Sequence, residues 1–347
     1  MEAFYDFFAA SNSGKGFQNY FPVIFNADNL NKIYIIKGGP GSGKSTLMKK
    51  IAKRAAENGS LIERYFCSSD PHSLDGIIIW PQKIAVLDGT SPHLQDPKYP
   101  GAVEEIINTG IFFRTEALQK NRDKIARLGD QKSRLYRIVY RYLSAAAEIQ
   151  QALDEALKPS IKTEKLRKAV SRVYSKIKTE RGTADIRFTE AISTDGYIHL
   201  PTLQEAAHTK ISVYDKYQTG TLFLTELAKL AKQDGIKCTI CPNPLSDQYI
   251  NEIMIGDTVF FLSNDKKPAN AERTVNMERF IHRETVAKKR HSIKYLLKCY
   301  HELISGALQN LAEIKTLHGE LEEIYIHSMD FDSLNAYSEE KIAEILK

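Results

Sequence analysis

The sequence contains little of what marks the specialised classes of protein. Of its 347 residues, four are cysteine, five are methionine and one is tryptophan. Four cysteines in a chain of this length do not suggest the disulfide framework of a small secreted domain, so we expect reduced thiols. Residues Met1 to Asp6 lack the basic start and apolar core of a signal peptide. These absences predict a cytoplasmic protein.

Long apolar runs and a large charge excess are also missing. No stretch reaches the roughly eighteen apolar residues of a membrane-spanning helix, so we expect no insertion into a membrane. Lysine and arginine number 48 against 43 aspartates and glutamates, a net charge of only +5. That excess gives little support to a nucleic acid partner. A hydrophobic content of 42% fits a globular protein, and the length allows two ordinary domains.

The strongest positive signal is a glycine-rich stretch from Lys37 to Thr46. The phosphate-loop pattern G-x-x-x-x-G-K-[ST], or Walker A, is filled by Gly38, Gly43, Lys44 and Ser45. The apolar run 33–36 before it predicts a strand, and helical spacing of apolar residues from Leu47 to Gly59 predicts a helix after it. Motif, strand and helix together predict a nucleotide-binding loop.

The chemistry of a triphosphate explains these residue types. Glycines let backbone N–H groups curl around phosphate oxygens, and the start of the following helix favours an anion. We expect the phosphates of ATP to lie against Gly38, Gly39, Pro40, Gly41, Ser42, Gly43, Lys44, Ser45 and Thr46. In this prediction Lys44 reaches the β- and γ-phosphates, and the Ser45 hydroxyl coordinates Mg²⁺.

A second acidic position is predicted at the tip of a strand. Residues 83–88 form an apolar run that ends in Asp88, as a Walker B strand does. We expect Asp88 to hold Mg²⁺ together with Ser45, and Lys44 and Asp88 to be the catalytic residues. Thr90 or His93 could sense the γ-phosphate or form an ordinary turn. No glutamate follows Asp88, so the water-activating residue of fast ATPases is not visible.

The rest of the first half predicts strands and then helices. We expect strands over 4–10 and 61–67, and polar turns over 11–16 and 68–76. Asp70 and Asp75 in the second turn could contact metal, water or an acceptor, or cap the turn. Residues 104–178 have a helical pattern that breaks at Pro159, which suggests a helical hairpin or lid. The helix face with Arg134, Arg137 and Arg141 is either solvated or binds a partner.

The second half of the sequence repeats the first. The helix 47–59 aligns with 223–235, the strands 33–37 and 84–87 align with 211–215 and 259–262, and the seam lies near Arg181. In this alignment the second loop, 216–221, is two residues shorter, Gly220 replaces the lysine, and Ser263 replaces Asp88. We therefore expect the second copy to keep the fold without cradling a triphosphate. A single C-x-x-C at Cys238 and Cys241 predicts two buried thiols in a strand.

The quoted motifs resemble one known family. The runs GGPGSGKSTLMKKI, CSSD-x-x-SLDG and AVLDGTSPH, followed by a second copy, are similar to a bacterial family of duplicated P-loop ATPase-like proteins, sometimes labelled nucleotide-kinase-related. The resemblance covers essentially the whole chain and implies a P-loop fold and ATP binding. Members of the family often carry an intact second phosphate loop, and this sequence departs from them at 216–221.

These observations predict an α/β protein with tandem P-loop NTPase-type parallel-sheet domains and long appended helices. Residues 1–180 form the domain with the intact loop and a helical insertion, and 181–347 form the degenerate repeat with a helical C-terminus. The leading functional prediction is Mg²⁺-dependent ATP binding with slow hydrolysis at one site, with a positive finger from Arg114, Arg122 or the second copy. The alternatives are a small-molecule or nucleotide kinase and a nucleotide-gated module that binds a protein partner.

Overall fold

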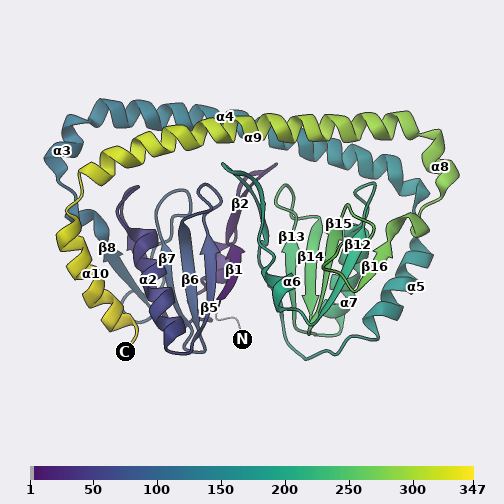
Figure 1. Cartoon of the computed structure of the whole chain (residues 1–347), viewed down its shortest axis with the longest axis horizontal. Helices are drawn as coiled ribbons and strands as arrows, with labels where there is room; N and C mark the ends of the chain where they lie inside the picture. Colours follow the sequence, from purple (N-terminus) through teal and green to yellow (C-terminus); the bar gives the residue numbers. More distant parts are fainter. Residues whose placement is uncertain (1–3) are drawn as a thin grey trace.

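The structure, a computed structural model, describes residues 4–347 and contains two six-stranded sheets beside a pair of long helices (Figure 1). Residues 1–3, on which part of the signal-peptide prediction rests, lie outside the described part of the chain. The α/β class is therefore confirmed. Within the described residues, no helix is long and apolar enough to cross a membrane.

The first sheet has the strand order β1-β5-β6-β7-β4-β8. Its strands are β1 (Phe4–Phe8), β4 (Lys32–Lys37), β5 (Leu61–Phe66), β6 (Leu74–Trp80), β7 (Ile84–Asp88) and β8 (Glu104–Asn108). Strand β6 runs antiparallel to both of its neighbours, and the other pairs are parallel. The prediction of a parallel sheet is therefore wrong in this respect. Only three residues, 81–83, link β6 to β7, which is too short for the crossover that parallel strands need.

The second sheet has the order β16-β12-β15-β14-β13-β9. Its strands are β9 (Ala184–Ile186), β12 (Thr209–Tyr214), β13 (Cys238–Pro242), β14 (Ile250–Ile255), β15 (Thr258–Ser263) and β16 (Arg273–Asn276). Here β14 is the antiparallel strand, so this sheet is also mixed. The predicted buried thiols Cys238 and Cys241 lie in β13.

Each sheet is covered on its outer face by two helices. Helix α2 (Lys44–Glu57) packs on the first sheet together with α10 (Phe331–Ile345), the last helix of the chain. Helix α7 (Thr221–Gln233) packs on the second sheet together with α5 (Thr163–Tyr174). The chain thus places its C-terminal helix on its N-terminal sheet.

The inner faces of the two sheets share one apolar core. Short helices α1 (Phe21–Ile24) and α6 (Thr202–Ala206) contribute to it, and Tyr65 of the first sheet belongs to the same cluster as Phe261 of the second. Two hairpins, β2 (Ala10–Ser13) with β3 (Gly16–Asn19) and β10 (Glu190–Ser193) with β11 (Gly196–His199), meet between the halves. The predicted turn over 11–16 is therefore wrong for 11–13, which form β2 and pair with β3. The Asn12 side chain also donates to the Ile192 carbonyl of the other hairpin at 2.8 Å.

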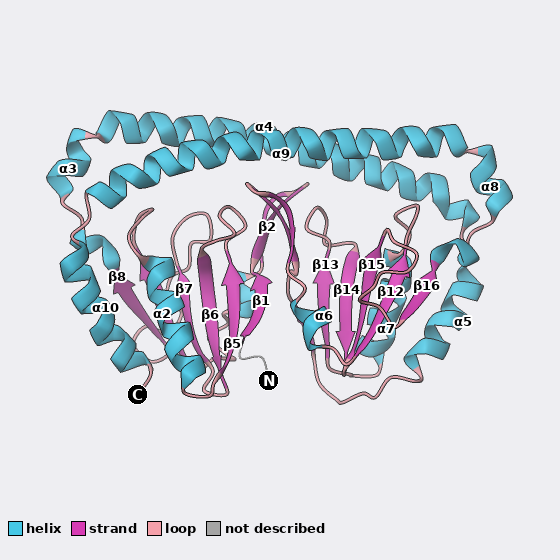
Figure 2. Cartoon of the chain, viewed as in Figure 1, coloured by secondary structure: helices cyan, strands magenta, loops and turns pink. Residues whose placement is uncertain are grey.

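The long helices α4 (Arg122–Leu157) and α9 (Arg290–His327) lie side by side beyond the carboxyl ends of the parallel strands (Figure 2). Each follows a 3-10 turn, 109–112 or 277–280, and a short helix, α3 (Thr115–Lys120) or α8 (Arg283–Lys288). The predicted break at Pro159 is confirmed, but the predicted helical start at Glu104 is wrong because β8 pairs there with β4. Helix α4 packs against α9 rather than folding back on α5. The predicted helical insertion is therefore part of a helix pair to which both halves of the chain contribute.

Candidate functional site

The glycine-rich loop connects the carboxyl end of β4 to the start of α2. Gly41 and Gly43 have φ angles of +64° and +76°, in the left-handed region that favours glycine. A Cβ at Gly38 would lie 2.2 Å from the Thr109 hydroxyl oxygen. The loop conformation therefore requires the residue types that the phosphate-loop pattern specifies.

The start of α2 presents free hydrogen-bond donors. Its N-cap, Gly43, supplies no side-chain cap. Among the described residues 4–347, no hydrogen bond engages the backbone N–H groups of Gly41 to Ser45. Unpaired N–H groups at the positive end of a helix dipole form an anion-binding site.

Lys44 is folded back over its own loop. Its ammonium group donates to the carbonyls of Gly38 at 3.1 Å and Gly39 at 2.7 Å, and lies 3.5 Å from the Asp88 carboxylate. The structure thus brings Lys44 and Asp88 together. These bonds hold the cation where the glycine-rich loop faces the tip of β7.

Asp88 is fixed in place by the turn that follows it. Its Oδ1 accepts hydrogen bonds from the backbone N–H of Thr90 at 2.9 Å and from the Thr90 hydroxyl at 2.6 Å. Thr90 therefore orients Asp88. The hydroxyl of Ser45 accepts a hydrogen bond from the N–H of Leu74 at 2.9 Å, which leaves a lone pair for another partner.

A second carboxylate and a histidine complete an acidic cluster. Ligand atoms of Asp75, Asp88 and His93 all lie within 4.8 Å of one another. His93 stacks on Phe21, and its two ring nitrogens face the Asp88 carbonyl at 3.0 Å and the Asp75 carboxylate at 3.4 Å. Burial alone would lower the pKa of His93, but Asp75 and Asp88 outweigh burial and raise it. The two carboxylates of this cluster supply oxygen ligands of the kind that Mg²⁺ prefers.

Other predicted residues lie elsewhere. Asp70 accepts hydrogen bonds from the N–H of His72 and the hydroxyl of Ser73. It therefore caps its own turn, which is the second of the two roles considered for it above. Arg114 starts α3, where its backbone N–H donates to the Ser328 carbonyl at 2.7 Å, and Arg122 is exposed at the start of α4. Neither arginine forms an ion pair with any residue between 4 and 347.

The helix pair adds two groups that the sequence did not reveal. Lys132 of α4 lies 2.8 Å from the His318 ring of α9, and burial lowers the pKa of this lysine. Burial, together with the positive charges of Lys132 and Lys44, lowers the pKa of His318 to about 4. His318 therefore lies close enough to Lys44 for the charge of Lys44 to affect its pKa. No spacing distinguishes Lys132 from Lys124, the other lysine of α4, so only the packing identifies it.

The end of α9 and the start of α10 lie directly on the glycine-rich loop. A Cβ at Gly41 would be 2.7 Å from Ile326, and one at Gly43 would be 2.9 Å from Leu334. The rings of Phe113 and Tyr325 pack together beside Gly39. The loop is therefore in contact with the C-terminal helices as well as with its own sheet.

The second loop surrounds a buried carboxylate, Asp215, whose pKa is raised by burial against the opposing effect of hydrogen bonds from the loop backbone. The carboxylate of Asp215 accepts from the N–H groups of Thr219 at 2.7 Å and Gly220 at 2.6 Å, at the start of α7. A Cβ at Gly220 would lie 2.9 Å from that carboxylate, so a larger residue such as lysine does not fit beside it. Asp215 thus occupies donors of the kind that the first loop leaves free.

The two loops differ in length by less than the alignment suggested. The N–H of Ile250 donates to the Thr221 hydroxyl at 2.7 Å, as Leu74 does to Ser45, so Thr221 lies where the first loop has its serine. Strand registers match Ile36 with Val213, which makes the second loop one residue shorter rather than two. They match Asp88 with Leu262, not Ser263, and Gly220 remains at the lysine position.

The comparisons with known proteins identified no relative of this chain. No protein-family model matches this chain, and no curated protein or solved structure matches it either. The resemblance to duplicated P-loop ATPase-like proteins therefore stays a prediction that rests on the quoted motifs.

Proposed function

We propose that the N-terminal half binds ATP with Mg²⁺ at the loop 38–46 and hydrolyses it slowly. The observation that supports this most is the placement of Lys44, on a loop with free N–H donors, 3.5 Å from Asp88 at the tip of the neighbouring strand. Cation, amide donors and carboxylate converge at the carboxyl edge of a sheet, where α/β proteins bind ligands.

Each residue has a role that follows from its position. Lys44 exchanges the carbonyls of Gly38 and Gly39 for oxygens of the β- and γ-phosphates, where charge develops during phosphoryl transfer. The Ser45 hydroxyl and the Asp88 carboxylate hold Mg²⁺, and Asp75 supports the same cluster. The bound ion would neutralise charge on the phosphate oxygens. His318, held by Lys132 of the other long helix, lies near Lys44 on the side of the helix pair.

Slow turnover follows from the absence of a free base. Gly89 comes directly after Asp88, and Thr90 uses its hydroxyl to orient Asp88. His93 has both ring nitrogens engaged by Asp75 and Asp88. Thr90 and His93 are thus not free to orient an attacking water, and we expect hydrolysis to be slow.

We also propose that the two halves are a duplicated P-loop-type unit in which the second copy has lost the nucleotide. The same strand order in both sheets and the matched bonds to Ser45 and Thr221 support this interpretation. The Asp215 carboxylate replaces the ligand's negative charge at the second loop. The second half then serves as a scaffold for the helix pair.

A second candidate function is a nucleotide-gated interaction module. The observation that favours it is the packing of Ile326 and Leu334 against Gly41 and Gly43. A phosphate group that enters the loop must displace these side chains, so binding would change how α9 and α10 dock. ATP would then control a protein partner through the helices.

The test is to measure Mg²⁺-dependent binding of ATP by isothermal titration and to follow phosphate release on the full chain. Lys44→Ala should reduce ATP affinity at least tenfold and abolish turnover, because the loop loses its only lysine on the phosphates. The matched control is Thr221→Ala, which removes the corresponding hydroxyl of the second loop and should leave both measurements nearly unchanged.

The outcomes separate the alternatives. Phosphate release without any acceptor supports the ATPase, and tight binding with negligible release supports the gated module. Transfer of phosphate only to an added metabolite would support a kinase instead. Equal loss from Lys44→Ala and Thr221→Ala, or no affinity for ATP in the unmodified protein, would overturn the one-site proposal.

A further inference from the structure

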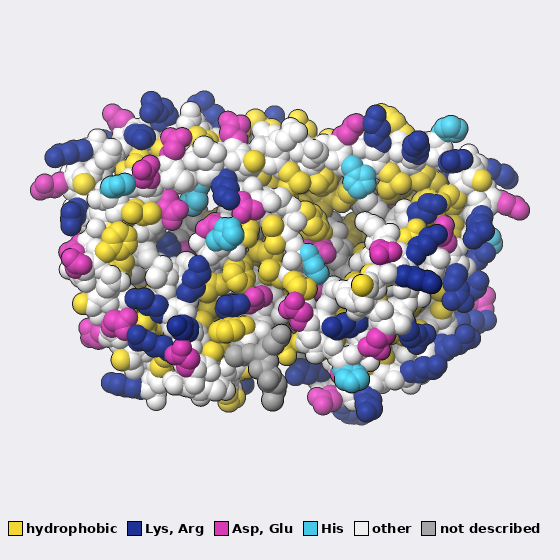
Figure 3. Space-filling model, viewed as in Figure 1, with side chains coloured by type: hydrophobic (Ala, Val, Ile, Leu, Met, Phe, Trp, Pro, Cys, Tyr) yellow, Lys and Arg dark blue, Asp and Glu magenta, His cyan; other side chains and the backbone are white. Residues whose placement is uncertain are grey.

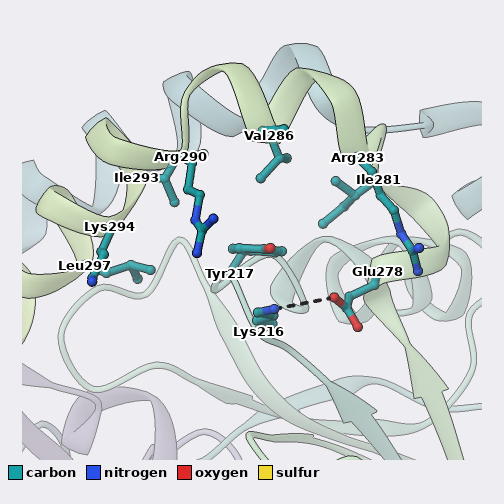
Figure 4. Close-up of a pocket in the computed structure, with 11 residues that line it drawn as sticks. Lys216, Tyr217, Glu278, Ile281, Arg283, Val286, Arg290, Ile293, Lys294 and Leu297 are labelled. Carbon is teal, nitrogen blue, oxygen red and sulfur yellow. Dashed lines mark ion pairs between the residues drawn. The ribbon is translucent and has the colours of Figure 1, made fainter.

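A cavity of about 460 Å³ lies in the second half, between the loop after β12 and the corner where α8 meets α9 (Figure 4). Lys216 and Tyr217 form its floor, and residues of the two helices form its roof. Its size falls within the range of small-molecule sites, roughly 300–1,000 Å³. None of the residues predicted from the sequence as ligand-binding lines this cavity.

The lining carries an excess of positive charge. Four cationic side chains, Lys216, Arg283, Arg290 and Lys294, surround a single carboxylate, Glu278. Glu278 pairs with Lys216 at 3.8 Å. Within residues 4–347 the other three cations form no ion pair or side-chain hydrogen bond. Lysine and arginine side chains also gather over this end of the molecule (Figure 3). Uncommitted cations around a concave surface favour an anionic ligand.

The remaining wall is apolar. It consists of the side chains of Tyr217, Ile281, Val286, Ile293 and Leu297. In Figure 4 Arg290 points down from α9 toward the ring of Tyr217, and Val286 and Ile281 point toward the same ring from above. An aromatic face next to arginine suits a flat apolar group that carries a charged end.

The neighbouring loop cannot supply the contacts of a phosphate loop. Asp215 already accepts the N–H groups of Thr219 and Gly220, so a ligand here must be held by side chains. We propose that this cavity binds an organic phosphate with at least two negative charges and an aromatic or apolar group. The phosphate lies among Arg283, Arg290 and Lys294, and the apolar group packs on Tyr217.

The test uses 1-naphthyl phosphate, a fluorescent aromatic dianion, titrated into the full-length protein by anisotropy. Arg290→Glu and, separately, Lys294→Glu should weaken its binding at least tenfold, because each reverses one charge in the lining. Lys288→Glu, an equal charge change on an exposed residue of α8 outside the cavity, should leave affinity unchanged. Lys44→Ala should also leave it unchanged, which separates this site from the first loop.

Two ligand controls decide the chemistry. Neutral 1-naphthol and inorganic phosphate should each bind at least tenfold more weakly than 1-naphthyl phosphate, because each lacks one half of the recognised group. Equal affinity for 1-naphthol would mean a purely apolar site, and equal affinity for phosphate a general anion site. Either result, or undiminished binding by both charge-reversed variants, would overturn the proposal.

Discussion

Asp215 and Gly38 begin equivalent loops, yet one is a buried carboxylate and the other has no side chain. Asp215 accepts two backbone N–H groups and the Thr219 hydroxyl at the start of α7. At the first loop the same region has no acceptor from the described chain. Together with the shorter loop and Gly220 at the lysine position, Asp215 distinguishes a loop that supplies its own acceptor from one whose N–H groups have none in the described chain.

This difference predicts a stability effect that phosphate can reverse. Asp215→Ala leaves buried donors unpaired and should lower the free energy of unfolding by about 2–3 kcal/mol, measured by urea denaturation. Added inorganic phosphate should restore part of the loss, because it can occupy the vacated donors. Asp265→Ala, at an exposed turn, is the control. An unchanged unfolding midpoint would contradict the internal-anion interpretation.

Glu252 predicts a pH dependence of stability. It is almost fully buried in β14, where burial raises its pKa to about 7 from an ordinary value of 4.5, against a hydrogen bond from Gln204. Between pH 4.5 and about 7, Glu252 therefore stays protonated in the folded protein but loses its proton in the unfolded chain. The free energy of unfolding falls as pH rises through this range.

Glu252→Gln keeps the hydrogen-bonding shape without a charge to desolvate. At pH 8 it should raise the free energy of unfolding, by about 3 kcal/mol at most. Near pH 4.5 the same change should have little effect. Thermal melts at both pH values test this, and an equal shift at the two pH values would show that ionisation of Glu252 is not the cause.

At the scale of elements, local patterns predicted β4, α2, β5 and β7 well, because apolar runs and a complete motif specify them. They did not predict β6 or β14, and the predicted turn over 68–76 is wrong for 74–76, where β6 begins. Both strands run antiparallel because short links join them to the next strand. Strand β8 was missed because Glu104 and Glu105 suit a helix start, and its pairing with distant β4 decides the outcome. Of the site, Lys44, Ser45 and Asp88 were predicted together, whereas Lys132 and His318 come from tertiary packing.

The contact between the first loop and the C-terminal helices predicts a local response to nucleotide. On addition of Mg²⁺ and ATP, hydrogen exchange should become faster in residues 322–334, because a phosphate at Gly41 and Gly43 displaces Ile326 and Leu334. The α7 region should not change. Lys44→Ala is the control and should abolish the response. Slower exchange across 322–334 would instead mean that the helices close over the nucleotide.

At the scale of the molecule, the halves are joined by more than the seam near Arg181. The inner faces of both sheets share one core, and α10 returns to the first sheet, where Ile342 and Ile345 pack with α2. Helix α5, which the sequence assigned to residues 1–180, packs on α7 of the other half. The division of the chain into 1–180 and 181–347 remains a prediction that rests on the repeat in the sequence. It does not follow that each part folds by itself.

This arrangement predicts that neither half folds alone. Residues 1–180 expressed without the rest should aggregate or give spectra of an unfolded chain, because the shared core and α10 are absent. Co-expression with 181–347 should restore a single species in gel filtration, with native circular dichroism. A stable, monodisperse 1–180 fragment would show that the shared core is dispensable.

Helix α9 has one end at each of the two proposed binding places. Arg290 and Lys294 face the cavity of the second half, whereas Tyr325 and Ile326 lie on the loop of the first. Its 38 residues make a lever on the order of 55 Å long. If binding of a ligand at one end of α9 tilts the helix, the two sites are coupled. Each ligand must then change the affinity of the protein for the other ligand by the same factor.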